Sequence, residues 1–123
     1  MSIKEECDRA IIAHAAWKSK FRAFLAGTLA LDPKLVEKND ACDFGKWLDG
    51  DGRAHLLPAE YERLHDLHVR FHTVAASVVR LKLSDDHATA QAAVERAGVF
   101  TRASAQLTSE VIAVRDARRG SPR

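Results

Sequence analysis

The chain has 123 residues, 46% of them hydrophobic and 29% charged, which suits one domain with its own core. Its 19 basic and 17 acidic side chains give a formal net charge of +2, without the basic excess typical of a general nucleic-acid binder. No apolar run approaches the roughly 20 residues that cross a membrane, and the charged N-terminus does not resemble a signal peptide. We therefore expect a cytoplasmic protein with reduced cysteines and neither a nucleic-acid nor a membrane partner.

The first expected element is an amphipathic helix over residues 2–29. Ser2 and Glu5 have the spacing of a capping box at its start. The helix should end before Asp32-Pro33, because proline disfavours helical geometry in the residue before it. Residues spaced alternately by three and four mark the inward face: Cys7, Ala10, His14, Trp17, Phe21, Phe24 and Thr28.

Residues 32–52 are expected to form a compact crossover with short helices. Asp32 and Asp40 are candidate N-caps, the second for a helix over residues 41–48. The crossover should be structured rather than flexible, since Phe44, Trp47 and Leu48 need burial.

Two further long helices are expected, over residues 58–83 and 85–118. The first carries an inward stripe of Tyr61, Leu64, His68, Phe71, Ala75 and Val78. The second carries Ala93, Ala97, Phe100, Ser104, Leu107, Val111 and Val114. With no strand pattern of useful length, the sequence predicts an all-α protein. The expected architecture is a small four-helix bundle with a short helical crossover, formed by a single domain over residues 1–119 with a frayed tail at 120–123.

Several side chains do not suit a plain apolar core. His14 and His68 lie in inward stripes, His72 follows one turn after His68, and Cys42 lies in the crossover. A buried imidazole costs free energy unless its ring nitrogens find partners. Three imidazoles and one thiolate fill the four tetrahedral positions that zinc prefers. We therefore predict a zinc site made by His14, Cys42, His68 and His72.

The remaining histidines and cysteine are less suited to that site. His65 is an alternative to one of the helical pair, or a supporting or exposed residue. His55 and His87 lie at a turn and a helix start, where we expect them to be solvated. Cys7 precedes His14 by two turns, about 10 Å, which is too far to bind the same ion.

Three segments together resemble the chemoreceptor zinc-binding domain family: His14-Ala-Ala-Trp17, Cys42-Asp-Phe-Gly45-Lys-Trp47 and His68-Val-Arg-Phe-His72. The resemblance implies a bacterial four-helix bundle, usually dimeric, with a zinc site formed by His14, Cys42, His68 and His72. It also implies that Gly45 allows close helix approach and that Trp17 and Trp47 pack around the metal.

The same resemblance implies a function in signal transduction, in which a chemotaxis receptor or diguanylate cyclase responds to zinc or to an oxidant such as hypochlorous acid. The chain has no room for either output domain, so we expect the output to be a separate protein or the domain to be a stand-alone sensor. We expect a non-enzymatic sensor, because four protein ligands leave no open position on zinc.

Two other functions stay open. One is a metal-free helical interaction module, and the less favoured one is a small zinc hydrolase, for which no glutamate lies between His68 and His72. A homodimer is expected from a second stripe of mostly small residues on the first helix: Ile12, Ala16, Ser19, Ala23 and Ala26.

Overall fold

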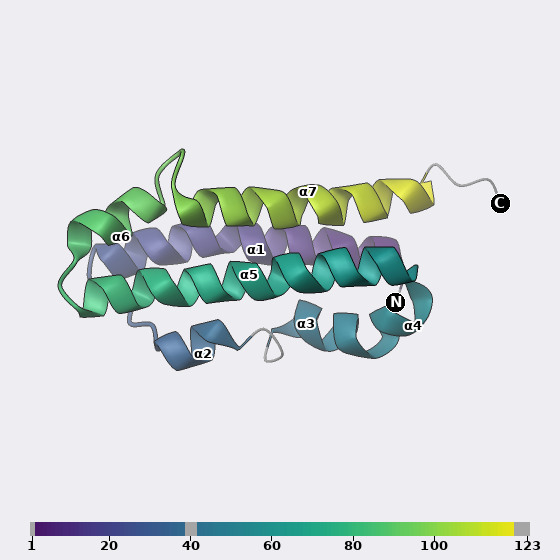
Figure 1. Cartoon of the computed structure of the whole chain (residues 1–123), viewed down its shortest axis with the longest axis horizontal. Helices are drawn as coiled ribbons and strands as arrows, with labels where there is room; N and C mark the ends of the chain where they lie inside the picture. The colour runs from purple at the N-terminus through teal and green to yellow at the C-terminus, as the bar shows by residue number, and fades with distance from the viewer. Residues whose placement is uncertain (1, 39–41, 120–123) are drawn as a thin grey trace.

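The computed structural model describes residues 2–38 and 42–119, and within these residues it contains helices and turns but no strand. Three long helices, α1 (Ile3–Leu25), α5 (Pro58–Leu83) and α7 (Val99–Arg119), run side by side (Figure 1). The prediction of an all-α bundle is confirmed. The frayed tail at 120–123 and the cap at Asp40 fall outside the described residues.

The fourth side of the bundle is built from short pieces rather than one helix. These are α2 (Pro33–Glu37), α3 (Asp43–Trp47), the π-helical turn η2 (Leu48–Gly52) and α4 (Arg53–His55). They follow one another along one side of the bundle in Figure 1. α2 packs on α5 and α3 packs on α1, while α7 packs on both long helices. This arrangement makes α1, α5 and the composite fourth side converge on one interior.

α1 ends at Leu25, four residues before the predicted end, because the chain turns at Gly27. This glycine adopts a φ of 86°, which side chains rarely adopt. The N–H of Thr28 then donates to the carbonyl of Ala23, a bond that closes a Schellman-type end. Thr28 was predicted to point inward and is instead exposed.

The prediction of a single helix over residues 85–118 is wrong. The chain instead forms two helices, α6 (His87–Ala93) and α7, with a turn between them. Asp86 caps α6, its carboxylate accepting from the N–H of Thr89. The turn exposes Ala97, which was predicted to be buried, and buries Ala103 more fully than Ser104. Gly98 lies so close to the end of α6 that a Cβ there would come 2.2 Å from the carbonyl oxygen of Ala93.

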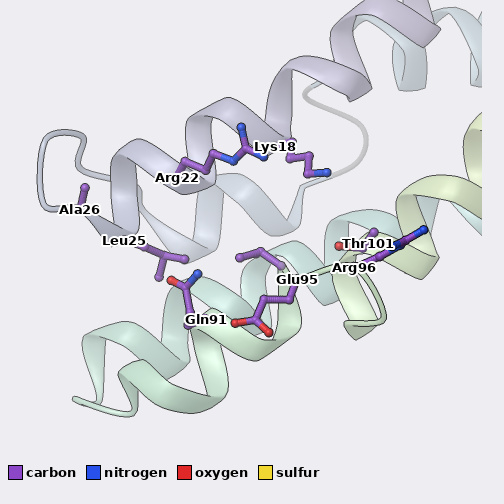
Figure 2. A pocket seen from close by; sticks show the side chains of 9 residues that line it. Lys18, Arg22, Leu25, Ala26, Gln91, Glu95, Arg96 and Thr101 are labelled. Atoms are coloured by element: carbon purple, nitrogen blue, oxygen red, sulfur yellow. The ribbon is translucent and has the colours of Figure 1, made fainter.

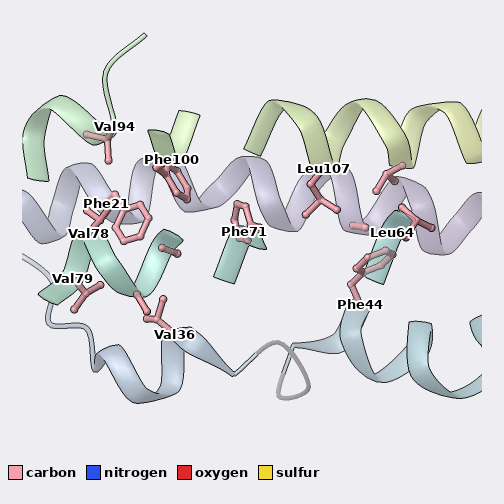
Figure 3. Close-up of a cluster of buried hydrophobic side chains, with 14 of the residues drawn as sticks. Phe21, Val36, Phe44, Leu64, Phe71, Val78, Val79, Val94, Phe100 and Leu107 are labelled. Carbon is pink, nitrogen blue, oxygen red and sulfur yellow. The ribbon is translucent and has the colours of Figure 1, made fainter. Parts of the chain in front are cut away.

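An apolar core fills the bundle along its length (Figure 3). At its centre the ring of Phe100 makes edge contacts with Phe21, at 4.6 Å between centroids, and lies 5.3 Å from Phe71. Cys7 is fully buried, as the sequence predicted. Burial of these side chains stabilises the bundle through the hydrophobic effect.

Candidate metal centre

The four predicted ligands meet in the interior of the bundle, from three separate parts of the chain. His14 comes from α1, His68 and His72 come from successive turns of α5, and Cys42 is the residue that precedes α3. One donor atom from each lies within 4.8 Å of every other. A tetrahedral zinc site, with zinc–nitrogen bonds of about 2.0–2.1 Å and a zinc–sulfur bond of about 2.3 Å, has this scale.

The three imidazoles are almost completely removed from water. His14 is 2%, His68 0% and His72 3% exposed, whereas Cys42 is half-buried. The ring of Phe71 lies 4.8 Å from that of His14, and the ring of Phe44 lies 5.1 Å from that of His68. Two phenylalanines, one from α5 and one from α3, therefore pack against the cluster.

Two of the imidazoles are oriented by backbone carbonyls. His14 Nδ1 lies 2.8 Å from the carbonyl oxygen of Ala10, one turn earlier in the same helix. His72 Nδ1 lies 2.8 Å from the carbonyl oxygen of Val36, a residue of α2. Because a carbonyl only accepts, each Nδ1 carries the proton and each neutral ring presents an Nε2 lone pair.

The other ring nitrogens are poorly satisfied. His14 Nε2 and His68 Nδ1 are buried with no hydrogen-bond partner among the described residues. His68 Nε2 lies 3.0 Å from His72 Nε2, so in the absence of a metal one of the two must carry a proton. A cation bound among these nitrogens would accept lone pairs that have no hydrogen-bond partner among the described residues. The donor set therefore fits zinc.

Burial also keeps these imidazoles neutral. It lowers the pKa of His14 from 6.5 to about 4, with a smaller contribution from His72, against the raising effect of the Ala10 carbonyl. The pKa of His68 falls to about 2, mainly through burial and then through the neighbouring histidines. Burial lowers the pKa of His72 as well. Neutral imidazole is the form that binds a metal ion.

The other candidates lie away from the cluster. His65 is half-buried, with Nδ1 3.6 Å from a carboxylate oxygen of Asp66 and its ring 5.6 Å from that of Tyr61. His55 and His87 are exposed, as predicted. The structure therefore groups His72, and not His65, with His68.

The aromatic surroundings differ from those the sequence suggested. Trp17 packs on Phe21 and Phe71, and Trp47 packs on Phe44, so both indoles lie behind the phenylalanines that contact the histidines. Gly45 is buried in α3. The carbonyls of Ala10 and Val36 were missed, since a backbone acceptor has no side-chain signal; only the one-turn spacing of Ala10 and His14 could have suggested the first.

The profile of the chemoreceptor zinc-binding domain matches residues 14–79, just over half of the chain. The chain belongs to the chemoreceptor zinc-binding domain family. The match runs from His14 to Val79 and so contains all four clustered residues, while α6 and α7 lie outside it. No curated protein and no solved structure matches the chain. None of the helices in the described parts of the chain is long and apolar enough to cross a bilayer.

Proposed function

We propose that the protein is a zinc-binding regulatory module and not an enzyme, with His14, Cys42, His68 and His72 as the four ligands of one zinc ion. The observation that carries the proposal is the buried Nε2 of His14, which has no hydrogen-bond partner among the described residues, in a cluster whose four donor atoms lie within 4.8 Å of one another. Membership of a zinc-binding family agrees with it. Four protein ligands complete the tetrahedral shell and leave no position for a substrate.

Within such a site, residues of the chain orient the ligands and exclude water. Zinc, when bound, supplies a positive charge that stabilises the thiolate and the imidazole lone pairs. The Ala10 and Val36 carbonyls hold two rings in the orientation that aims Nε2 inward. Phe44 and Phe71 exclude water from one side of each ring they contact. Occupancy would therefore tie α1 and α5 to the segment that leads into α3.

Competition titration against a chromogenic zinc chelator, under reducing conditions, tests the ligand set. His72→Ala should lower zinc affinity at least about a hundredfold, because one of four metal bonds is lost. His55→Ala and His87→Ala are matched controls at exposed histidines and should leave the affinity unchanged. Equal affinities for all three variants, or no zinc uptake by the unmodified chain, would overturn the proposal.

The regulatory output is a separate proposal. The family is associated with chemoreceptors, and we propose that zinc occupancy is read in trans by a signalling protein, a chemoreceptor or a diguanylate cyclase. Any such partner must bind the zinc-loaded and zinc-free forms with different affinities. A pull-down in which neither receptor nor cyclase discriminates between the two forms would exclude these partners. The cytoplasmic location stays a prediction.

We propose Cys42 as the redox-sensitive residue, because it is half-buried whereas Cys7 is fully buried. Oxidation of the Cys42 sulfur by hypochlorous acid, which is reduced to chloride, gives a sulfenic acid and removes a thiolate ligand. Zinc release and Cys42 modification, followed together by a chelator and by mass spectrometry, should rise in parallel. Oxidation of Cys7 first, with zinc retained, would contradict this mechanism.

The homodimer also remains a proposal. Ile12 is 71% exposed, and Ala16 and Ser19 beside it are exposed, so this face of α1 is open to a second copy. Sedimentation should give about twice the chain mass, and Ala16→Glu should dissociate the dimer and retain zinc. A monomer for the unmodified chain would disprove it.

A further inference from the structure

A second feature of the molecule lies far along the bundle from the histidine cluster, where α6 and α7 separate. The turn between these helices and the C-terminal half of α1 line a cavity of about 880 Å³ that is open to solvent (Figure 2). This volume falls within the range of pockets that bind small organic molecules. α1 contributes one wall, and α6, the turn and the first turn of α7 contribute the other. The lining residues used below are Lys18, Arg22, Leu25, Val94, Glu95, Arg96 and Thr101.

The wall opposite α1 is held in place by backbone hydrogen bonds. The N–H groups of Val94, Glu95 and Gly98 donate to carbonyls of Gln91, Ala92 and Glu95, at 2.9–3.3 Å. A Cβ at position 98 would collide with the backbone of Ala92 and Ala93, so the turn packs tightly against the end of α6 and only glycine fits there. The backbone of this wall is therefore fixed before any ligand arrives, which lowers the entropic cost of binding.

The lining carries unpaired positive charge. Lys18 and Arg22 lie one turn apart on α1, and Arg96 lies on the turn between α6 and α7. None of the three forms an ion pair or side-chain hydrogen bond among the described residues, and neither does Glu95, the one carboxylate of the lining. Figure 2 shows Lys18 and Arg22 on the α1 side and Glu95 on the opposite side.

Two other features complement these charges. Thr101 lines the cavity from the first turn of α7, a turn without any acidic residue, where the helix dipole is positive. Leu25 and Val94 add an apolar surface beside the cations. Guanidinium groups match the oxygens of a phosphate geometrically, and the volume leaves room for an organic body as well.

We propose that this cavity binds a small phosphorylated organic molecule, with Lys18, Arg22 and Arg96 around the phosphate and Leu25 and Val94 against the organic part. The site lies outside residues 14–79 in its α6 and α7 wall, so it is a property of this chain beyond the family match. It does not depend on zinc occupancy and gives the module a second input.

Isothermal titration of the zinc-loaded full chain with adenosine 5′-monophosphate tests the site, with inorganic phosphate and adenosine as the two partial probes. The nucleotide should bind, inorganic phosphate should compete with it, and adenosine should bind at least about tenfold more weakly. Arg22→Gln and Arg96→Gln should each lower nucleotide affinity about tenfold. Arg102→Gln removes the same charge from an exposed position on α7 outside the lining and should have no effect.

Amide chemical shifts recorded in the same titration locate the probe, and they should change around Arg22, Arg96 and Thr101 and not around the zinc ligands. Three results would overturn the proposal. The first is no binding of nucleotide or phosphate at millimolar concentration. The second is an equal loss in all three arginine variants, which indicates nonspecific attraction. The third is binding of an acidic peptide in place of the nucleotide, which would make the cavity a protein-docking surface.

Discussion

At the residue scale, the histidines differ in how each ring is held. His14 is oriented by a carbonyl of its own helix, His72 by a carbonyl of α2, and His68 Nδ1 by no hydrogen bond among the described residues. A buried polar atom without a partner lowers the stability of the metal-free protein by about 1–3 kcal/mol. The arrangement therefore favours a bound cation and lowers the stability of the metal-free protein.

This arrangement predicts that the metal-free protein loses stability in mild acid. The pKa of His14 is 6.5 when unfolded and about 4 when folded, so between these values the unfolded chain binds more protons. Stability is therefore greatest above pH 6.5 and falls as the pH drops toward 4. From pH 7 to pH 5, His14 alone should reduce the free energy of unfolding by about 2 kcal/mol. Urea denaturation of chelator-treated protein at the two pH values measures this.

The matched control is His14→Leu, which removes the titrating group and the unpartnered Nε2 together. It should abolish tight zinc binding, make the metal-free protein more stable by about 1–2 kcal/mol at pH 7, and reduce the pH dependence by the share that His14 contributes. A variant that is less stable than the parent, with the same pH dependence, would show that the buried imidazole is not a source of instability.

These residues also show what sequence could predict. The inward positions of His14, His68 and Cys7 follow from helical spacing alone, because a period of 3.6 residues places them on the buried face. His72 was preferred to His65 because it borders the stripe of His68 and Phe71, and His72 is the one that lies in the cluster. The Val36 carbonyl could not be predicted, since its contact with His72 spans 36 residues and involves no side chain of α2.

At the scale of elements, α2 connects the metal centre to the bundle surface. Its Val36 is buried against α5 and its carbonyl accepts from His72 Nδ1. Next to it, Glu37 binds Arg80 of α5 through two hydrogen bonds of 3.2 Å. A bond from α2 to a metal ligand means that docking of α2 and zinc affinity are thermodynamically linked.

We therefore predict that Glu37→Gln weakens zinc binding without touching a ligand. The Glu37–Arg80 pair is half-exposed, so its contribution is at most about 1 kcal/mol and the loss of affinity should be about two- to fivefold. Arg63→Gln is the control, because it breaks an exposed pair between α5 and α7 at Glu110 and should not change zinc affinity. Equal effects of both substitutions on zinc affinity in the chelator competition assay would show that docking of α2 is not linked to zinc binding.

The elements that were predicted least well are those that depend on local backbone geometry. The bounds of α5 match the prediction at Pro58 and Leu83, where a proline and a Ser-Asp sequence delimit a strong stripe. The end of α1 at Leu25 and the turn after Ala93 were missed. Both depend on a glycine, Gly27 through its positive φ and Gly98 through its contact with α6, and neither property is visible in hydrophobic spacing.

At the scale of the whole molecule, the bundle brings the ligands together because its fourth side is not one helix. A continuous helix there would present side chains at regular spacing, whereas Cys42 has extended backbone just before α3 and its side chain lies with the three histidines. The ring of His14 on α1 lies 5.2 Å from that of His68 on α5, and α7 packs on both helices. An all-α bundle with a crossover of short helices could be predicted from the sequence, whereas the way these short helices pack as the fourth side depends on three-dimensional contacts.

The central claim is that three imidazoles and one thiolate hold one zinc ion in this interior. X-ray absorption at the zinc edge, on reduced zinc-loaded protein, measures that shell directly. The account predicts three nitrogen ligands at about 2.0–2.1 Å and one sulfur at about 2.3 Å, with the sulfur lost in Cys42→Ala. A shell without sulfur in the unmodified protein, or one of five or six oxygen and nitrogen ligands, would contradict it.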